Sequence, residues 1–201
     1  MLTEKGFDAA LKLSSIPAVR RDSLRVKSYE VQKVVKKLVE ATKPQDYNPF
    51  DISKKIVKTT TEFTLRDRGF RQAIVETYDC RCSVCGLKIK SPDSLSWEVE
   101  AAHIVPNYFR GRDDIWNGVA LCHFHHWAFD VGWFTLLDNY RILVSQQINH
   151  VPADFGKMGS YECVRSLVDK AATLFLPKRT ELYPHLNAIR WHRQNIFDKQ
   201  L

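Results

Sequence analysis

The sequence contains no long hydrophobic run. No apolar stretch in its 201 residues approaches the roughly 20 residues that a membrane-spanning helix needs, so no membrane partner is expected. The first residues, MLTEKGFDAALKLSS, lack the long apolar stretch of a secretory signal, and the chain shows no internal repeat or low-complexity tract. Its 44% hydrophobic and 26% charged residues exclude a disordered chain. We therefore expect a globular, cytoplasmic protein.

Cysteine is scarce and odd in number, which argues against a framework of disulfide bonds. Three of the five cysteines, Cys80, Cys82 and Cys85, lie within six residues of one another. In a cytoplasmic chain such clustering favours metal ligation.

Acidic residues are also scarce in the N-terminal part of the chain. Residues 1–60 carry 13 Lys and Arg against 7 Asp and Glu, which accounts for +6 of the net charge of +7. This asymmetry predicts either a basic arm that binds a polyanion, most often nucleic acid, or a lysine-rich helix surface exposed to water.

Hydrophobic spacing predicts both helices and strands. Apolar residues recur at helical intervals in several segments, and two others alternate as paired strands do. The second strand pair is expected to turn at the dipeptide Asp138-Asn139. The expected elements are helices over 23–43, about 70–78, 122–131, 161–174 and 185–197, and β-hairpins over 87–104 and 133–145.

Two pairs of residues have the ligand spacing of tetrahedral zinc sites. Cys82 and Cys85 form one pair, Cys122 and His125 form the other, and two residues separate the ligands in each. One such pair alone would be weak evidence, because a redox pair or chance could produce it. The combination with a pair that enters a helix is far more specific. Four protein ligands close the coordination sphere, so we expect a structural zinc ion.

The stretch NGVALCHFHHWAFD, residues 117–130, contains a second group of polar residues. His126 lies about 100° further round the helix than His125 and is free for another role. Asp130 follows four residues later on the same helix face, a common way to present two ligands to one ion. His103 ends the preceding strand in EAAHIVP, and Asn117 precedes the helix.

His103, Asn117 and His126 together resemble the motif of the HNH nuclease family, whose ββα-metal core runs His, Asn, His. The nine-residue step from Asn117 to His126 is also that of the family. The likeness covers about residues 70–137, and RWHRQNIF near the C-terminus resembles the tail of bacterial restriction-type members. The resemblance implies an α+β fold with three regions. These are a basic helical region for DNA contact or dimerisation over 1–60, a ββα-metal nuclease core with structural zinc over 61–145, and a helical extension over 146–201.

The resemblance further implies hydrolysis of phosphodiester bonds in DNA with one divalent cation. His103 would act as the general base on the attacking water, Asn117 would fix its orientation, and His126 would bind the ion. Asp130 matches a position where relatives have a further ligand. A neutral imidazole, with an ordinary pKa near 6.5, suits the base role near neutral pH. Mg²⁺ or Mn²⁺ is the expected catalytic ion, with Co²⁺ or Ni²⁺ as alternatives.

One position departs from the family's pattern. Many members place Asp or His directly before the catalytic histidine as a metal ligand, where this chain has Ala102. Glu100, on the same strand face as residue 102, is expected either to replace that ligand or to be an exposed carboxylate. Glu98 is a weaker candidate on the same face.

The other residues of these types are expected to have ordinary roles. His123 is expected to be exposed or to contact a phosphate, and no function is assigned to His150, His185 or His192. The remaining cysteines are expected to be free thiols, and the tryptophans near the motif to form a small local core: Cys80, Cys163, Trp97, Trp116, Trp127 and Trp133.

We therefore expect a metal-dependent endonuclease of the restriction or phage-defence type that acts on double-stranded DNA. The alternatives are a non-specific or nicking HNH nuclease and a zinc-knuckle DNA-binding module without catalysis, which Ala102 favours. A homodimer through the helices at 23–43 and 161–174 is expected, although these helices could pack on the core instead. Contacts with the DNA backbone are expected from Lys33, Lys36, Lys37, Lys88, Lys90, Arg110 and Arg112.

Overall fold

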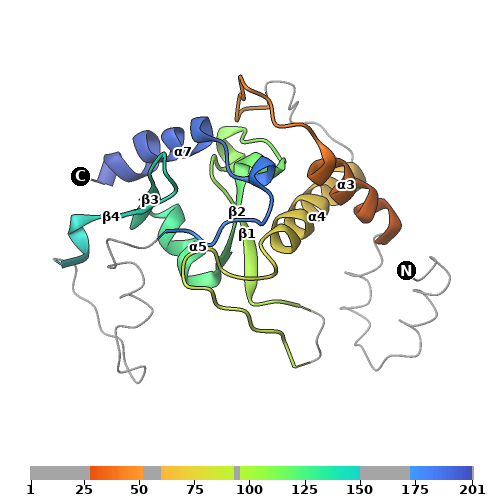
Figure 1. Ribbon diagram of the computed structural model, residues 1–201, viewed down its shortest axis with the longest axis horizontal. Coiled ribbons are helices and arrows are strands. Elements are labelled where there is room, and N and C mark those ends of the chain that lie inside the picture. The colour runs from red at the N-terminus through yellow and green to blue at the C-terminus, as the bar shows by residue number, and fades with distance from the viewer. Residues whose placement is uncertain (1–27, 52–59, 93–95, 150–172, 201) are drawn as a thin grey trace.

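A two-stranded antiparallel sheet with a helix on either side forms the centre of the fold. The computed structural model describes residues 28–51, 60–92, 96–149 and 173–200. Strands β1 (Val99–His103) and β2 (Gly118–Cys122) lie between helix α4 (Thr60–Thr77) and helix α5 (His123–Asp130) (Figure 1). Both helices contact both strands. This arrangement confirms the expected α+β fold with a ββα core.

Strand β1 pairs with β2 over its whole length. Val99 lies opposite Cys122, and His103 lies opposite Gly118. The expected hairpin over 87–104 is confirmed only as a short antiparallel pairing: Lys90 bridges Trp97, the N–H of Glu98 donates to the carbonyl of Ile89, and the N–H of Ser91 donates to the carbonyl of Ser96. The rest of the expected second strand, β1, pairs with β2 instead. Strand β2 was not expected at all. Every residue of β2 is buried, so the strand lacks the alternation of apolar and polar side chains that marks a half-exposed strand.

Helix α5 confirms the helix expected over residues 122–131, and it follows β2 without a connecting loop. Cys122 is the last strand residue and the N-terminal cap of the helix. Gly132, with a φ of 77°, donates its N–H to the carbonyl of Phe129 and ends the helix. Because His125, Ala128 and Phe129 face the core, His126 and Asp130 are left on the outer side.

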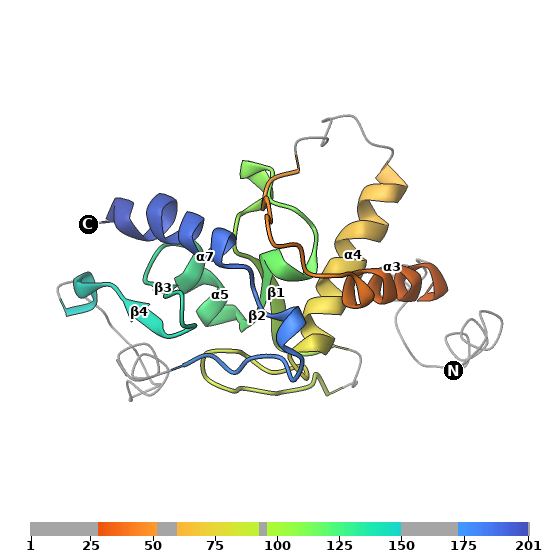
Figure 2. The ribbon, with the colours of Figure 1, turned by 45° about the horizontal axis from the view of Figure 1, so that its top comes forward.

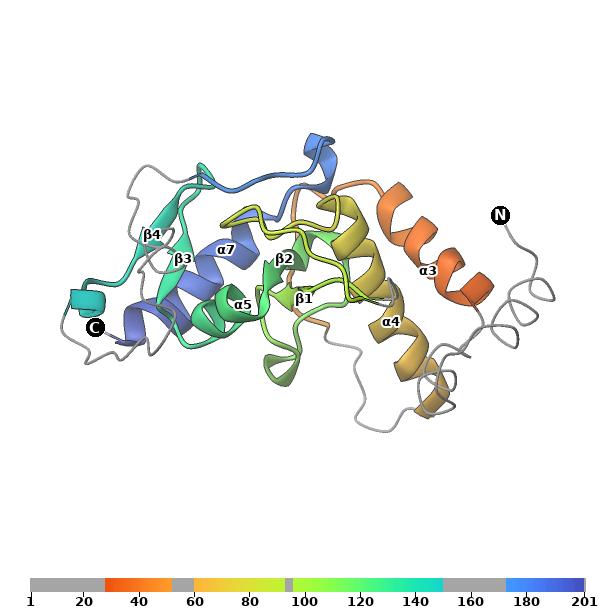
Figure 3. The same ribbon diagram turned by 90° about the horizontal axis from the view of Figure 1, so that it is seen from below.

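Helix α3 (Ser28–Glu40) packs on α4, the helix with which it makes most of its contacts (Figure 3). A Cβ atom on Gly69 of α4 would lie only 2.2 Å from Cγ1 of Val34, so the glycine lets the two helices approach closely. Val31 and Val35 are buried. Helix α4 begins about ten residues earlier than expected, because its first turns are too polar to show a helical hydrophobic stripe.

The C-terminal part of the described chain covers a second hairpin (Figure 2). Strands β3 (Phe134–Leu136) and β4 (Ile142–Val144) pair as expected. Their turn is one residue longer than expected, because Tyr140, with a φ of 60°, adds a left-handed residue after Asp138-Asn139. Helix α7 (Leu186–His192) packs on β3 and continues as a π-type turn and a 3₁₀ turn over 193–200.

The expected tryptophan core is confirmed only in part. Trp116 is buried, and Trp133 is half-buried against the core. Trp97 lies beneath the ammonium groups of Lys88 and Lys90, at 5.5 and 4.8 Å from the ring centre. Trp127 is 53% exposed and does not belong to a core, because residues 125, 128 and 129 occupy the inner face of α5.

Several expectations lie outside the described residues. These are Cys163, His150, most of the helix at 161–174, the first residues of the helix at 23–43 and the second half of the turn at 91–94. Within the described segments, no helix is long and apolar enough to cross a bilayer.

Candidate active site and metal centre

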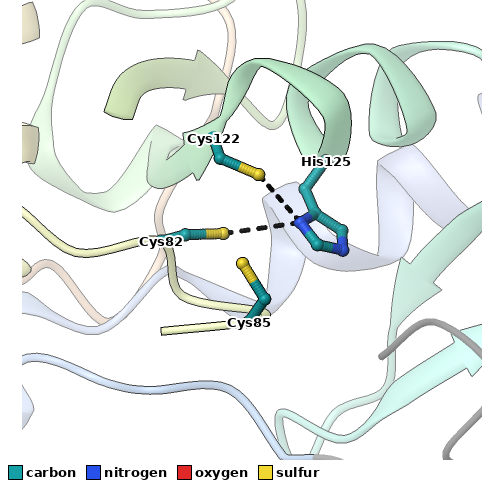
Figure 4. A group of neighbouring side chains, drawn as sticks. All are labelled: Cys82, Cys85, Cys122 and His125. Atoms are coloured by element: carbon teal, nitrogen blue, oxygen red, sulfur yellow. Dashed lines mark hydrogen bonds between the residues drawn. The ribbon is translucent and has the colours of Figure 1, made fainter. Parts of the chain in front are cut away.

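The two predicted ligand pairs meet in one cluster (Figure 4). The donor atoms of Cys82, Cys85, Cys122 and His125 all lie within 4.8 Å of one another. Nδ1 of His125 lies 3.7 Å from Sγ of Cys82 and 2.9 Å from Sγ of Cys122. Four donors at about 2.3 Å from a central zinc ion would be about 3.8 Å apart in a tetrahedron, so the cluster has the size and the N/S chemistry that zinc requires.

The local backbone explains why the thiols of Cys82, which is buried, and of Cys85, which is exposed, both point toward the cluster. The N–H of Cys82 donates to the carbonyl of Leu87, and the N–H of Gly86 donates to the carbonyl of Cys82. Gly86 has a φ of 75°, which lets the chain turn tightly after Cys85. The neighbouring thiols of Cys122 and Cys85 lower the pKa of Cys82, and the thiolate is the form that binds zinc.

His103 stands at the end of β1 between an aromatic ring and a carboxylate. The ring of Phe70 from α4 is stacked on the imidazole with 4.1 Å between ring centres. Nε2 of His103 lies 3.1 Å from Oδ1 of Asp113, whose side chain is only 6% exposed. The imidazole is therefore held from two sides while keeping some access to solvent.

Asn117 closes the loop that follows His103. Its side-chain oxygen accepts the N–H of Val105, and its amide group donates to the carbonyls of Val105 and Arg112. All of these bonds go to the backbone of the same loop, and Asn117 is fully buried. Asn117 therefore shapes the loop that carries Asp113 to His103.

His126 lies between two carboxylates. Its Nδ1 is 3.0 Å from Oε2 of Glu100, and its Nε2 is 3.6 Å from Oδ2 of Asp130. Partial burial raises the pKa of Asp130, while the nearby His126 and His103 oppose that rise. Two carboxylates and an imidazole at the protein surface match the oxygen and nitrogen ligands that Mg²⁺ or Mn²⁺ binds.

The missing ligand at residue 102 has a candidate replacement in Glu100. Ala102 is fully buried and offers no ligand atom. The carboxylate of Glu100 reaches from the same strand to His126. Glu98 takes a different part: it accepts the N–H of His123 at the start of α5 and lies 3.1 Å from Nδ1 of that residue.

The other histidines are placed largely as expected. His123 is exposed, and its hydrogen bond with Glu98 raises its pKa despite some desolvation. His185 caps helix α7 through the N–H of Asn187. His192 is buried between Thr135 and Phe129, and burial lowers its pKa to about 4. Cys80 is a free thiol.

The basic residues expected to contact DNA lie on three surfaces, one of which is formed by Lys88 and Lys90, exposed beside Trp97. Lys33, Lys36 and Lys37 are exposed along α3. Arg110 and Arg112 are exposed in the loop between β1 and β2. The guanidinium of Arg112 donates a hydrogen bond to the carboxylate of Asp114. Burial raises the pKa of Asp114, and this hydrogen bond opposes the rise only in part. Their contact with DNA stays a prediction.

Sequence reasoning missed Asp113. The residue lies in a polar loop, ten positions after His103, and no motif spacing singles it out. Only the folding of the loop around Asn117 places its carboxylate beside the imidazole.

Comparison with known proteins matches the central part of the chain. Residues 82–137 match the family model described as HNH endonuclease. Among solved structures the chain is similar to one titled "Modification dependent TagI restriction endonuclease", with 20% identity and a TM-score of 0.45. That match covers 63% of this chain and only 37% of the other. No curated protein matches the chain.

Proposed function

We propose that this chain is a divalent-metal-dependent endonuclease of the restriction or phage-defence type, acting on double-stranded DNA, because residues 82–137 match the HNH endonuclease family model. The observation that carries the proposal is the convergence of His103, His126, Glu100 and Asp130. The imidazole of His126 lies 3.0 Å from Glu100 and 3.6 Å from Asp130, and His103 is near enough to influence the carboxyl group of Asp130.

In the proposed reaction His103 is the general base. A neutral imidazole whose Nε2–H donates to Asp113 keeps its lone pair on Nδ1, and that lone pair takes a proton from water. The water oxygen then forms a bond to phosphorus as the bond to the leaving 3′ oxygen breaks. Phe70 and Asp113 hold the ring, and Asn117 holds the loop that carries Asp113.

Glu100, His126 and Asp130 would hold the catalytic ion. When bound, such an ion supplies positive charge that stabilises the phosphate and the leaving oxygen. The chain's own contribution is to place two carboxylates and one imidazole on β1 and α5, beside His103. Cys82, Cys85, Cys122 and His125 would hold a separate zinc ion with a structural role.

DNA affinity is proposed to come from the exposed lysines of α3 and from the arginines of the loop between β1 and β2. Contacts between these side chains and phosphates position the duplex without reading its sequence. Lys33, Lys36 and Lys37 would contribute mainly to the salt-dependent part of binding.

The direct test is incubation of the purified protein with supercoiled plasmid, with Mg²⁺ or Mn²⁺ and with a chelator, followed by sequencing of the DNA ends. Cutting should require the added ion. His103→Ala should bind DNA and unfold at the same temperature as the wild type but cut more slowly, by a factor on the order of 10². Undiminished cutting by this variant would exclude His103 as the base, and binding without any cutting by the wild type would favour the non-catalytic alternative.

A further inference from the structure

The loop between β1 and β2 presents two exposed aromatic side chains at its tip. Tyr108 is 75% exposed and Phe109 is 43% exposed. Tyr108 is the most exposed large hydrophobic side chain in the described part of the chain. A single exposed aromatic residue is ordinary on a protein surface, so the surroundings of the pair must decide what it does.

The tip is rigid for an exposed loop. The carbonyl of Pro106 accepts the N–H groups of Phe109 and Gly111, and the N–H of Asp51 donates to the carbonyl of Arg110. At Gly111 the chain passes so close to Val105 that an added Cβ would lie 1.8 Å from the carbonyl oxygen of that residue. Backbone contacts therefore hold the tip in place, and little conformational entropy would be lost when the aromatic pair binds a ligand.

The two rings are braced from one side only. Tyr108 and Phe109 have their ring centres 4.6 Å apart, and Phe109 meets Trp191 edge-on at 5.0 Å. Trp191 in turn meets Phe50 at 5.9 Å. Tyr108 is thus the free end of a row of four aromatic rings and has a stiff support behind it.

The position of the tip relative to the nuclease site suggests its ligand. Tyr108 follows His103 by five residues, which limits the distance between their Cα atoms to about 18 Å. Successive nucleotides of one strand rise about 3.4 Å each, so this span corresponds to about five base steps. Arg110 follows directly and is exposed, which gives the tip the positive charge that a DNA backbone requires.

We propose that Tyr108, supported by Phe109, stacks on a base of the DNA within a few steps of the bond that is cut. This proposal rests on the proposed function. The bases of a duplex expose only their edges, so a ring must enter between two stacked pairs, and flexible pyrimidine–purine steps open most easily. The tip therefore adds a preference for deformable steps to a site whose other contacts are with phosphates.

Substitution at the tip tests the proposal through the salt dependence of binding. In a chelating buffer, which prevents cutting, the affinity for a fluorescein-labelled mixed-sequence duplex is measured by anisotropy at several salt concentrations. Tyr108→Ala should weaken binding by about 5- to 150-fold, the range expected for one lost base stack, without changing the salt slope. Tyr108→Phe should retain most of the affinity. Arg110→Ala should instead reduce the slope by about 0.9, as loss of one phosphate contact does.

Phe175→Ala is the matched control, because Phe175 is an exposed aromatic residue that lies against Gly86. It should bind like the wild type. A second measurement uses a duplex carrying iododeoxyuridine, which crosslinks to stacked aromatic rings under light. The crosslinked peptide should contain Tyr108 or Phe109.

An affinity of Tyr108→Ala equal to that of the wild type would overturn the proposal, as would crosslinks that all lie outside residues 107–110. In both cases the wild type would still bind and cut DNA, so the proposed function would stand. If the wild type neither bound nor cut DNA, the proposed function would fail, and this proposal would fail with it.

Discussion

At the residue scale, we expect Asp113 to orient the imidazole of His103, and this effect on catalysis can be measured separately from any effect of Asp113 on the stability of the fold. Asp113 lies 3.1 Å from Nε2 of the imidazole and has a nearly buried side chain. Asp113→Asn should lower kcat about 10-fold or more at unchanged KM, because the charge that holds the ring in one tautomer is lost. In a His103→Ala background the same substitution should have almost no further effect.

A double-mutant cycle on plasmid cleavage measures this dependence, with thermal unfolding of each variant as the control for folding. A purely structural role for Asp113 predicts losses that add in the double variant. Additive losses of activity would therefore show that Asp113 does not act through His103.

A second prediction at this scale concerns acid stability. His192 is buried with its ring stacked on Phe129 at 3.7 Å, and its folded-state pKa is about 4 against an ordinary value near 6.5. The unfolded chain binds a proton at His192 more readily than the folded chain does. The free energy of unfolding therefore has its full value above about pH 6.5 and decreases as the pH falls towards 4. At about pH 5 the loss should be roughly 2 kcal/mol.

Urea unfolding of the wild type and of His192→Gln near pH 7 and pH 5 tests this, with zinc content measured in each sample. The variant should lose about 2 kcal/mol less than the wild type between the two conditions. His123 cannot produce the effect, since Glu98 raises its pKa, and a raised histidine pKa stabilises the fold at low pH instead. If the free energy of unfolding of both proteins changed equally between pH 7 and pH 5, protonation of His192 would not destabilise the fold, and this prediction would be wrong.

At the element scale, the parts that could be predicted from the sequence are those with a local signature. Helix α5 begins at the Cys122/His125 ligand pair and is followed by Gly132, and the β3–β4 hairpin has a turn dipeptide, so both were found. Strand β2 was missed because all five of its residues are buried, which removes the period of two. The start of α4 was missed because its first turns are polar.

The candidate site follows the same division. His103, Asn117 and His126 were singled out by their resemblance to the HNH motif. Glu100 was expected either to replace the missing ligand or to be an exposed carboxylate, and the structure places its carboxylate against His126. Asp113 was missed, because its position depends on loop closure and not on any periodicity.

The cluster of Cys82, Cys85, Cys122 and His125 joins elements that are distant in the sequence, and loss of the zinc ion proposed to bind there should unfold this region. Cys85→Ser should lose its zinc and show no cooperative thermal transition, because metal binding and folding of such sites are coupled. Cys80→Ser is the matched control: this thiol lies in the same segment outside the cluster, and the variant should keep about one zinc per chain. Metal analysis by mass spectrometry and calorimetry provide the two measurements. Full zinc content in Cys85→Ser would show that the knuckle assignment is wrong.

At the scale of the whole molecule, one nuclease site can cut only one strand in a binding event. We expect two chains to act together on a duplex, related by a two-fold axis. The apolar side of α3, which the sequence analysis offered as a dimer contact, is used within the chain, since Val31 and Val35 are buried where α3 packs on α4. Any dimer must therefore use another surface.

Light scattering on the DNA-bound protein, together with a time course of plasmid cutting, tests this expectation. A dimer should convert supercoiled plasmid to linear DNA with little nicked intermediate. A monomer on DNA that accumulates nicked circles before linear product would support the nicking alternative.

The cysteine–histidine cluster and the proposed site of the catalytic ion share helix α5, where His125 of one and His126 of the other are adjacent. Cys122 and His125 face the cysteine cluster, while His126 and Asp130 face outward towards Glu100. Insertion or deletion of one residue between His125 and His126 would rotate one set of ligands by about 100° relative to the other. A change of length at this point would therefore disturb one of the two ligand sets, whereas substitution at His126 or Asp130 would remove ligands of the outer set and leave the cysteine cluster in place.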